Sequence, residues 1–229
     1  MPMEIVSDKM IGVDLDGTLV KSDEACKVWY GQNYGVDFSS YSTRQMWEHV
    51  HGLGVKKLEM MGAFIKSGEF ADAPVFEDAG EVLVDLSKRN GLVFITSRPL
   101  NHFNLGLITT RWIEGKLPGL TPPITLIQAF SRDMPIPGLP GKGEICHREG
   151  VDVLVDNMLD HAEECAVNGT KVVLFDPEEE YPNYELPRGV ERVTRWMEVP
   201  GAISRLLKAP WKPGDPIIEV PLGTLEPNN

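Results

Sequence analysis

Two carboxylates separated by one residue follow a short apolar run at residues 10–13. They belong to the hexapeptide Asp-Leu-Asp-Gly-Thr-Leu, in which Asp14 and Asp16 precede Gly17, a residue that tolerates the backbone of a tight turn. Such a pair suits phosphoryl transfer, because one carboxylate can attack phosphorus while the other protonates the leaving oxygen and then deprotonates water. The simpler alternative is an acidic turn that caps the next helix.

Three further apolar runs also stop at a hydroxyl or carboxyl side chain. They are residues 92–95, 151–155 and 172–175, which end at Thr96, Asp156 and Asp176. We predict that each run is a buried strand. Helix-compatible stretches at residues 75–90 and 161–167 alternate with these strands, which indicates an α/β fold with a parallel sheet covered on both faces. Ligands bind beyond the carboxyl ends of such strands, where the polar side chains are expected.

Residues 22–74 interrupt this alternation. They contain helix-compatible stretches at 24–34, 43–49 and 55–67, and no convincing strand. We predict a small α-helical cap here, inserted after the first strand, with residues 1–21 and 75–208 forming the core domain.

Two segments have the composition of loops. Residues 117–143 are rich in Pro and Gly, so most of this stretch should be loop, with one strand at 124–128. Residues 209–229 turn to Pro, Gly and Glu, which predicts a C-terminal tail that is loosely held or packed on a neighbour.

The composition excludes several classes of protein. The chain has 229 residues, of which 42% are hydrophobic, which suits a globular protein. The sequence shows neither a membrane span nor a secretory signal, so we expect a cytoplasmic protein without a membrane partner. A net charge of -12 without a basic cluster disfavours nucleic acid as a partner. The oligomeric state stays open, with a homodimer as one possibility.

The motifs, in their order, resemble the haloacid dehalogenase (HAD) superfamily. Its first motif is Asp-x-Asp-Gly-Thr followed by Leu or Val, and residues 14–19 match it. Its second motif supplies a hydroxyl that holds the transferring phosphoryl oxygens; Thr96 in Ile-Thr-Ser-Arg-Pro matches, with Ser97 and Arg98 as auxiliary substrate-binding residues. An isolated Thr-Ser after a strand would otherwise predict only a helix N-cap. The resemblance implies a Rossmann-like, doubly wound parallel sheet.

The later motifs of the resemblance concern a lysine and two acids. Lys142 stands where the family has a lysine that neutralises the attacking carboxylate, although a lone lysine is more often solvated. Asp156 and Asp160 resemble the fourth motif, with Asn157 where some members have a second adjacent acid. The resemblance implies a Mg²⁺ cofactor held by Asp14, the carbonyl of Asp16 and Asp156, with Asp160 acting through water or as an orienting partner.

The predicted cap resembles the C1 class, which selects small phosphorylated substrates. The chain is also similar to the putative 5′-nucleotidase group that includes the deoxyribonucleotidases, and an aromatic residue of the cap such as Trp47 could stack a nucleobase. Aromatic residues at helical spacing more often form the core of such a cap.

Other functions remain open at this stage. A phosphatase for sugar phosphates or other small phosphoesters, or a phosphomutase of the same fold, would share every motif above. A non-catalytic protein that binds phosphorylated ligands is an alternative of another class, against which the complete set of acids argues.

Overall fold

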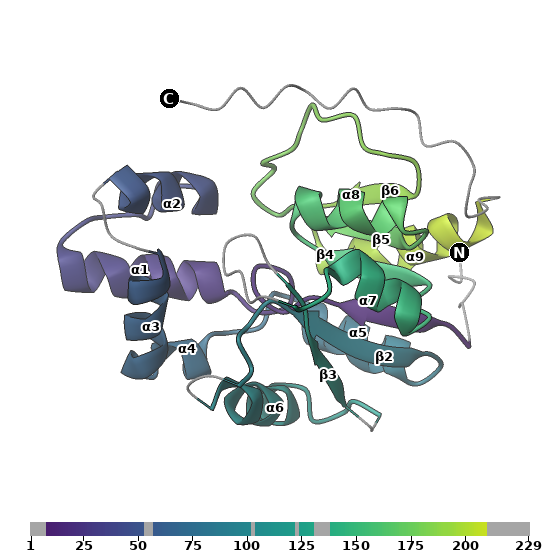
Figure 1. The fold of residues 1–229 in the computed structure, drawn as a ribbon, viewed down its shortest axis with the longest axis horizontal. Helices are drawn as coiled ribbons and strands as arrows, with labels where there is room; N and C mark the ends of the chain where they lie inside the picture. The colour runs from purple at the N-terminus through teal and green to yellow at the C-terminus, as the bar shows by residue number, and fades with distance from the viewer. Residues whose placement is uncertain (1–7, 53–56, 102–103, 122–123, 131–137, 210–229) are drawn as a thin grey trace.

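A parallel sheet forms the centre of the molecule. The computed structural model describes residues 8–52, 57–101, 104–121, 124–130 and 138–209 (Figure 1). Within these ranges the strand order is β3-β2-β1-β4-β5-β6, and every neighbouring pair is parallel. The strands are β1 (Met10–Val13), β2 (Gly91–Thr96), β3 (Thr125–Gln128), β4 (Val153–Asp156), β5 (Lys171–Phe175) and β6 (Val190–Val193). The order reverses between β1 and β4, and this is where ligands bind in open α/β sheets.

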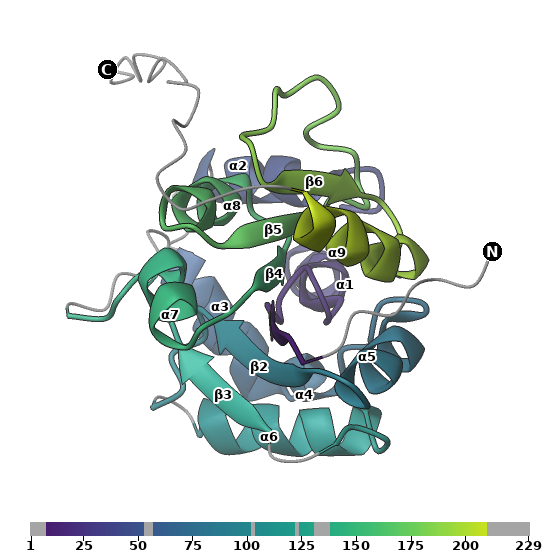
Figure 2. The same ribbon diagram turned by 90° about the vertical axis from the view of Figure 1, so that its right-hand side faces the viewer.

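Helices cover both faces of the sheet (Figure 2). The helices α5 (Ala79–Ser87), α6 (Leu105–Lys116) and α9 (Val199–Lys208) pack on one face, against side chains such as Ile11 and Val173. The other face holds α7 (Lys142–Arg148) and α8 (Leu159–Val167), against side chains such as Leu154 and Val172. Successive strand residues therefore alternate between two apolar layers, as a sheet buried on both faces requires.

Four helices stand apart from the sheet and form what we call the helical insert. They are α1 (Ser22–Tyr34), α2 (Thr43–Gly52), α3 (Lys57–Ser67) and α4 (Glu69–Asp72). Figure 1 shows them on the left, beside the layered core. Tyr30, Phe38, Met46 and Phe64 are fully or almost fully buried in a separate apolar cluster of the insert. Most aromatic side chains of this region thus form the core of the insert.

The predicted α/β fold is confirmed, with differences at single elements. The helix predicted from residue 75 begins at Ala79, because Val75 pairs with Val20 in a bridge and the Phe76 N–H donates to the Leu19 carbonyl. Strand β6 and the core helices α6, α7 and α9 were not predicted. The sequence of β6, Val-Glu-Arg-Val, has two adjacent charged residues between its valines, so at this sheet edge it shows neither a continuous apolar run nor strict alternation.

Two further expectations meet the limits of the described ranges. The predicted tail, residues 209–229, lies outside them except for Ala209. In the part of the chain that the structure describes, no helix is long and apolar enough to cross a membrane.

Trp196 connects the short 3₁₀ helix η1 (Trp196–Glu198) to the loop after β1. Its indole N–H donates to the Thr18 carbonyl over 2.8 Å, and its ring lies 5.8 Å from that of Phe175, centroid to centroid. Only 1% of Trp196 is exposed. Through this contact, the segment that follows β6 holds the loop that bears Asp16 in place.

We expect Trp196→Phe to lower the free energy of unfolding by about 1–3 kcal/mol, because the Thr18 carbonyl loses its buried donor. Urea unfolding followed by circular dichroism measures the loss. The matched control is Met197→Leu, since Met197 is 57% exposed and should tolerate the change. Equal stability of the two variants would contradict the role given to Trp196.

Candidate active site

The loop after β1 places Asp14 beside the end of β4. The Asp14 N–H donates to the Val155 carbonyl over 2.9 Å, so β1 and β4 stay paired up to the residues that end them, Asp14 and Asp156. The chain then turns at Gly17, whose φ is 72°. A Cβ at Gly17 would lie 2.3 Å from the Asn157 amide nitrogen, so the loop requires glycine there for both conformation and space.

Lys142 lies between the two carboxylates. Its Nζ is 2.8 Å from Asp14 Oδ1 and 2.7 Å from Asp156 Oδ2. Asp14 is 5% exposed, and Lys142 and Asp156 are fully buried. The structure therefore brings together three residues that sequence reasoning took from three separate motifs, although their assigned roles stay predictions.

Close packing of two helices places Lys142 at this point. Lys142 is the first residue of α7, and its neighbours on both sides are glycines. A Cβ on Gly143 would lie 2.8 Å from the Glu164 backbone carbonyl, whereas a Cβ on Gly141 would meet only the movable Glu164 carboxyl group. Since Glu164 belongs to α8, a larger residue at position 143 would push α7 away from α8 and move Lys142 off the carboxylates.

Burial and mutual charge shift the pKa values of this group. Burial raises the pKa of Asp14 to about 6, with a further rise from the Asp156 charge that Lys142 only partly offsets. Burial by itself would also raise the pKa of Asp156, but Lys142 and His161 outweigh it and hold that pKa below its usual range. Burial disfavours the charged form of Lys142, yet the two carboxylates keep its pKa above the ordinary value. Asp156 and Lys142 are thus ionised at neutral pH.

Asp16 faces a different cation, Arg98. Two guanidinium nitrogens of Arg98 donate to the two carboxyl oxygens of Asp16, each over 2.7 Å. A third donates to the Thr109 hydroxyl over 3.0 Å, and the guanidinium carbon lies 4.4 Å from the centre of the Phe70 ring. Burial would raise the pKa of Asp16, but the Arg98 charge and hydrogen bonds outweigh it and lower that pKa. In this arrangement Arg98 binds the candidate general acid.

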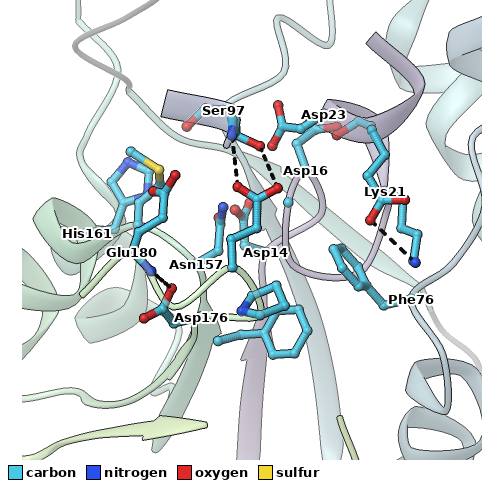
Figure 3. A pocket seen from close by; sticks show the side chains of 18 of the residues that line it. Asp14, Asp16, Lys21, Asp23, Phe76, Ser97, Asn157, His161, Asp176 and Glu180 are labelled. Atoms are coloured by element: carbon cyan, nitrogen blue, oxygen red, sulfur yellow. Dashed lines mark hydrogen bonds and ion pairs between the residues drawn. The ribbon is translucent and has the colours of Figure 1, made fainter. Parts of the chain in front are cut away.

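A cleft of about 1080 Å³ opens above these groups. Figure 3 shows Asp14, Asp16 and Asn157 in its middle, with His161 on one side and Lys21 on the other. Its walls also include the predicted site residues Ser97, Arg98, Trp47 and Asp160. The Thr96 hydroxyl lies just beneath, fully buried, and accepts the Arg98 N–H over 3.1 Å. Ser97 Oγ is buried without a hydrogen-bond partner among the described residues, so a ligand in the cleft could use it.

Sequence reasoning missed His161 as a site residue. Its Nδ1 lies 3.2 Å from Asp156 Oδ1, the oxygen that also accepts the Met158 N–H over 2.8 Å. The sequence contains a signal for it, because His161 falls in the first turn of the helix that follows Asp156. Asn157, seen in the sequence only as a departure from an acid, accepts the Thr18 hydroxyl over 3.2 Å and so connects the first and fourth motifs.

The chemistry of the donors fits a hard cation. Asp14, Asp156 and the Asp16 carbonyl are oxygen ligands of the type that Mg²⁺ prefers, and two carboxylates outnumber the single ammonium between them. Within the described ranges, no three His, Cys, Asp or Glu side chains are arranged as a metal site. A cation held here would therefore also need water and a phosphate group as ligands, which is usual for Mg²⁺.

Comparisons with solved structures identify the fold. The chain is similar to a HAD hydrolase of family IA, variant 3, from Entamoeba histolytica, at 13% identity and a TM-score of 0.53, over 88% of this chain and 100% of that one. It is similar to the putative HAD-hydrolase YfnB from Bacillus subtilis, described as bound to magnesium, at 11% identity and a TM-score of 0.53, over 86% and 99%. It is also similar to a putative beta-phosphoglucomutase from Bacteroides vulgatus, at 14% identity and a TM-score of 0.53, over 90% of this chain and 93% of that one.

These likenesses show that the chain has the fold of HAD-like hydrolases. No protein-family model matches the sequence, and no curated protein matches it significantly.

We expect Lys142→Met to lower the free energy of unfolding by about 3–5 kcal/mol, because two buried carboxylates lose their cation. Asp14, whose pKa is raised to about 6 with Lys142 in place, loses its proton as the pH rises. Its unfavourable charge in the folded state then appears, so the loss should be larger in mildly alkaline than in mildly acidic solution. Urea unfolding in both buffers measures this.

The control for this prediction is Lys88→Met, which removes a cation from an exposed pair with Asp85. Its effect should be small and nearly independent of pH. A Lys142→Met variant that behaves like this control would show that the ammonium does not stabilise the buried carboxylates.

Proposed function

We propose that this chain is a HAD-superfamily phosphatase that uses Mg²⁺ to hydrolyse a phosphomonoester of a small molecule. The observation that supports it best is the Asp14–Lys142–Asp156 group at the reversal point of the sheet, directly beneath a cleft. An ionised carboxylate with one oxygen on a fixed ammonium, next to a cleft large enough for a small ligand, is equipped to attack phosphorus.

The proposed reaction has two displacements. An oxygen of Asp14 attacks phosphorus and forms an aspartyl-phosphate, while the bond to the leaving oxygen breaks and Asp16 gives that oxygen a proton. Asp16 then takes a proton from water, and the resulting hydroxide attacks the phosphorus of the aspartyl-phosphate. Inorganic phosphate leaves, and Asp14 is restored as a carboxylate. Lys142 neutralises Asp14 and the incoming phosphoryl group throughout.

The residues at the carboxyl end of β2 are proposed to bind the phosphoryl oxygens of the substrate. Thr96 and Ser97 would hold them through hydroxyl and backbone groups, and the unpartnered Ser97 hydroxyl supports this. The contact between Arg98 and Asp16 adds a condition, since Asp16 bound to a guanidinium is an ionised carboxylate. Before it can protonate the leaving oxygen, Asp16 must therefore separate from Arg98 and take up a proton from solvent, and the freed guanidinium can then bind the substrate's phosphate.

Mg²⁺ would be held by Asp14, the Asp16 carbonyl and Asp156, with Asp160 in support. The cation supplies charge neutralisation between the anionic nucleophile and the anionic substrate. The residues of the chain orient these groups: His161 and the Met158 N–H hold Asp156, and Lys142 fixes the oxygen of Asp14 that it contacts.

We further propose that the helical insert is a C1-type cap and that the substrate is a nucleoside 5′-monophosphate in the cytoplasm. Trp47 of α2 lines the same cleft as Asp14, so a base in the cleft could stack on the indole. A phosphatase for other small phosphoesters or a phosphomutase would use the same Asp14 chemistry. Activity assays on a panel of phosphoesters distinguish these enzymes from a non-catalytic protein that binds phosphorylated ligands.

Asp14→Asn should abolish phosphate release from every substrate, because an amide cannot form the acyl phosphate. The fold should persist, since the change removes a carboxyl whose ionisation burial opposes. Phosphate release is measured with nucleoside monophosphates, sugar phosphates and an aryl phosphate, each with Mg²⁺ and with a chelator, which should also stop the reaction. The control Asp85→Asn changes an exposed acid far from the cleft and should be fully active. Undiminished turnover by Asp14→Asn would refute the mechanism.

Trp47→Ala should raise KM for nucleoside monophosphates by about tenfold through the loss of base stacking. Hydrolysis of a small aryl phosphate should change little, because that substrate does not reach across the cleft. Steady-state kinetics on both substrates measure the difference. Val28→Ala serves as the control, since Val28 is 60% exposed on the same insert. An equal loss on both substrates would count against stacking.

A further inference from the structure

Glu178 connects the core to the helical insert across the cleft. It lies just after β5, in a turn that Asp176 holds in place by accepting the N–H groups of Glu180 and Tyr181 over 2.8 and 3.1 Å. Asp176 itself is only 3% exposed. The turn is thus anchored to the sheet, and Glu178 projects from a rigid support.

One Glu178 carboxylate contacts two different helices of the insert. Its Oε1 lies 2.7 Å from Lys27 Nζ, on α1. Its Oε2 accepts the backbone N–H of Thr43, the first residue of α2, over 2.8 Å, and the Thr43 hydroxyl lies 3.4 Å from Oε1. These partners are 151 and 135 residues away in the sequence.

Both contacts of Glu178 should be stronger than a fully exposed ion pair. The Lys27 side chain is 11% exposed and that of Glu178 33%, so solvent screens this pair less than a fully exposed one. The contact to Thr43 is a charge-assisted hydrogen bond to a helix N-terminus, where the N–H groups lack partners within the helix and the dipole favours an anion. Glu178 caps α2 from outside its own segment.

The position of α2 determines one wall of the cleft. Trp47 and Glu48 follow Thr43 by about one helical turn, and both line the cleft together with Asp14. Glu178 also lines it. A shift of the α2 N-terminus would therefore move the wall that faces the candidate nucleophile.

We propose that Glu178 is a positioning residue that fastens α1 and α2 over the cleft and thereby sets which leaving groups fit. The part of this inference that concerns substrates rests on the proposed phosphatase function. The fastening itself does not, because it concerns only the contacts between the turn after β5 and the insert.

The variants Glu178→Gln, Glu178→Ala and the control Glu185→Gln test this inference. Gln keeps an acceptor for the Thr43 N–H and loses the charge, whereas Ala loses both. Glu185 is an exposed carboxylate on the same connection between β5 and β6 and should behave as wild type. Lys27→Met, alone and combined with Glu178→Gln, completes a double-mutant cycle in which coupled residues give non-additive effects.

The first measurement is amide hydrogen exchange of α2 in the full-length protein. Exchange of the α2 amides should be about tenfold faster in Glu178→Ala, intermediate in Glu178→Gln and unchanged in Glu185→Gln. The second is KM for adenosine 5′-monophosphate and for p-nitrophenyl phosphate with Mg²⁺. KM for the nucleotide should rise about tenfold in Glu178→Ala and clearly more than KM for the aryl phosphate.

The outcomes separate the two proposals. Wild-type exchange of α2 in Glu178→Ala would overturn the fastening, whatever the activity. Faster exchange with equal increases of both KM values would overturn the role in specificity. If the unaltered protein releases no phosphate from either substrate, the proposed function fails, and hydrogen exchange still decides whether Glu178 holds the insert.

Discussion

The ion group formed by Lys142, Asp14 and Asp156 is the constraint on which the rest of the site depends. Two carboxylates this deeply buried are unfavourable without a cation, and removal of one partner from such a group is costly. The fold meets this need by packing α7 closely against α8 at Gly143, which lets Lys142 reach both acids. Stability and candidate chemistry therefore rest on the same three side chains.

A second ion pair has a different character. Arg98 and Asp16, which both line the cleft, form a two-point contact, with the Arg98 guanidinium over the Phe70 ring of the insert. The first group holds the candidate nucleophile, Asp14, against the Lys142 ammonium, whereas the second holds the candidate acid, Asp16, in its unprotonated form. Under the proposed mechanism, Asp14 is placed for attack, whereas Asp16 has to leave Arg98 and gain a proton before it can act as an acid. Phe70 places part of the insert next to that exchange.

The parts of the fold that sequence reasoning predicted share a local cause. Strands β1, β2, β4 and β5 are short apolar runs that end at polar residues, and a buried parallel strand needs little more than this. The edge strand β6 is only partly buried and carries two adjacent charged residues, so its sequence resembles that of a loop. The true start of α5 depends on pairing between Phe76 and Leu19, residues far apart in the chain, which no local pattern reports.

The sequence by itself determined the parallel α/β class, the four polar strand ends and the residue types needed for phosphoryl transfer, because each depends on neighbours in the chain. Only the tertiary structure decided which groups meet. Lys142 contacts Asp14 at the end of β1, Arg98 binds Asp16, His161 contacts Asp156, and Glu178 accepts the Thr43 N–H from 135 residues away. Charge partners are selected by distance in space, and that distance is set by how helices and strands pack rather than by spacing along the chain.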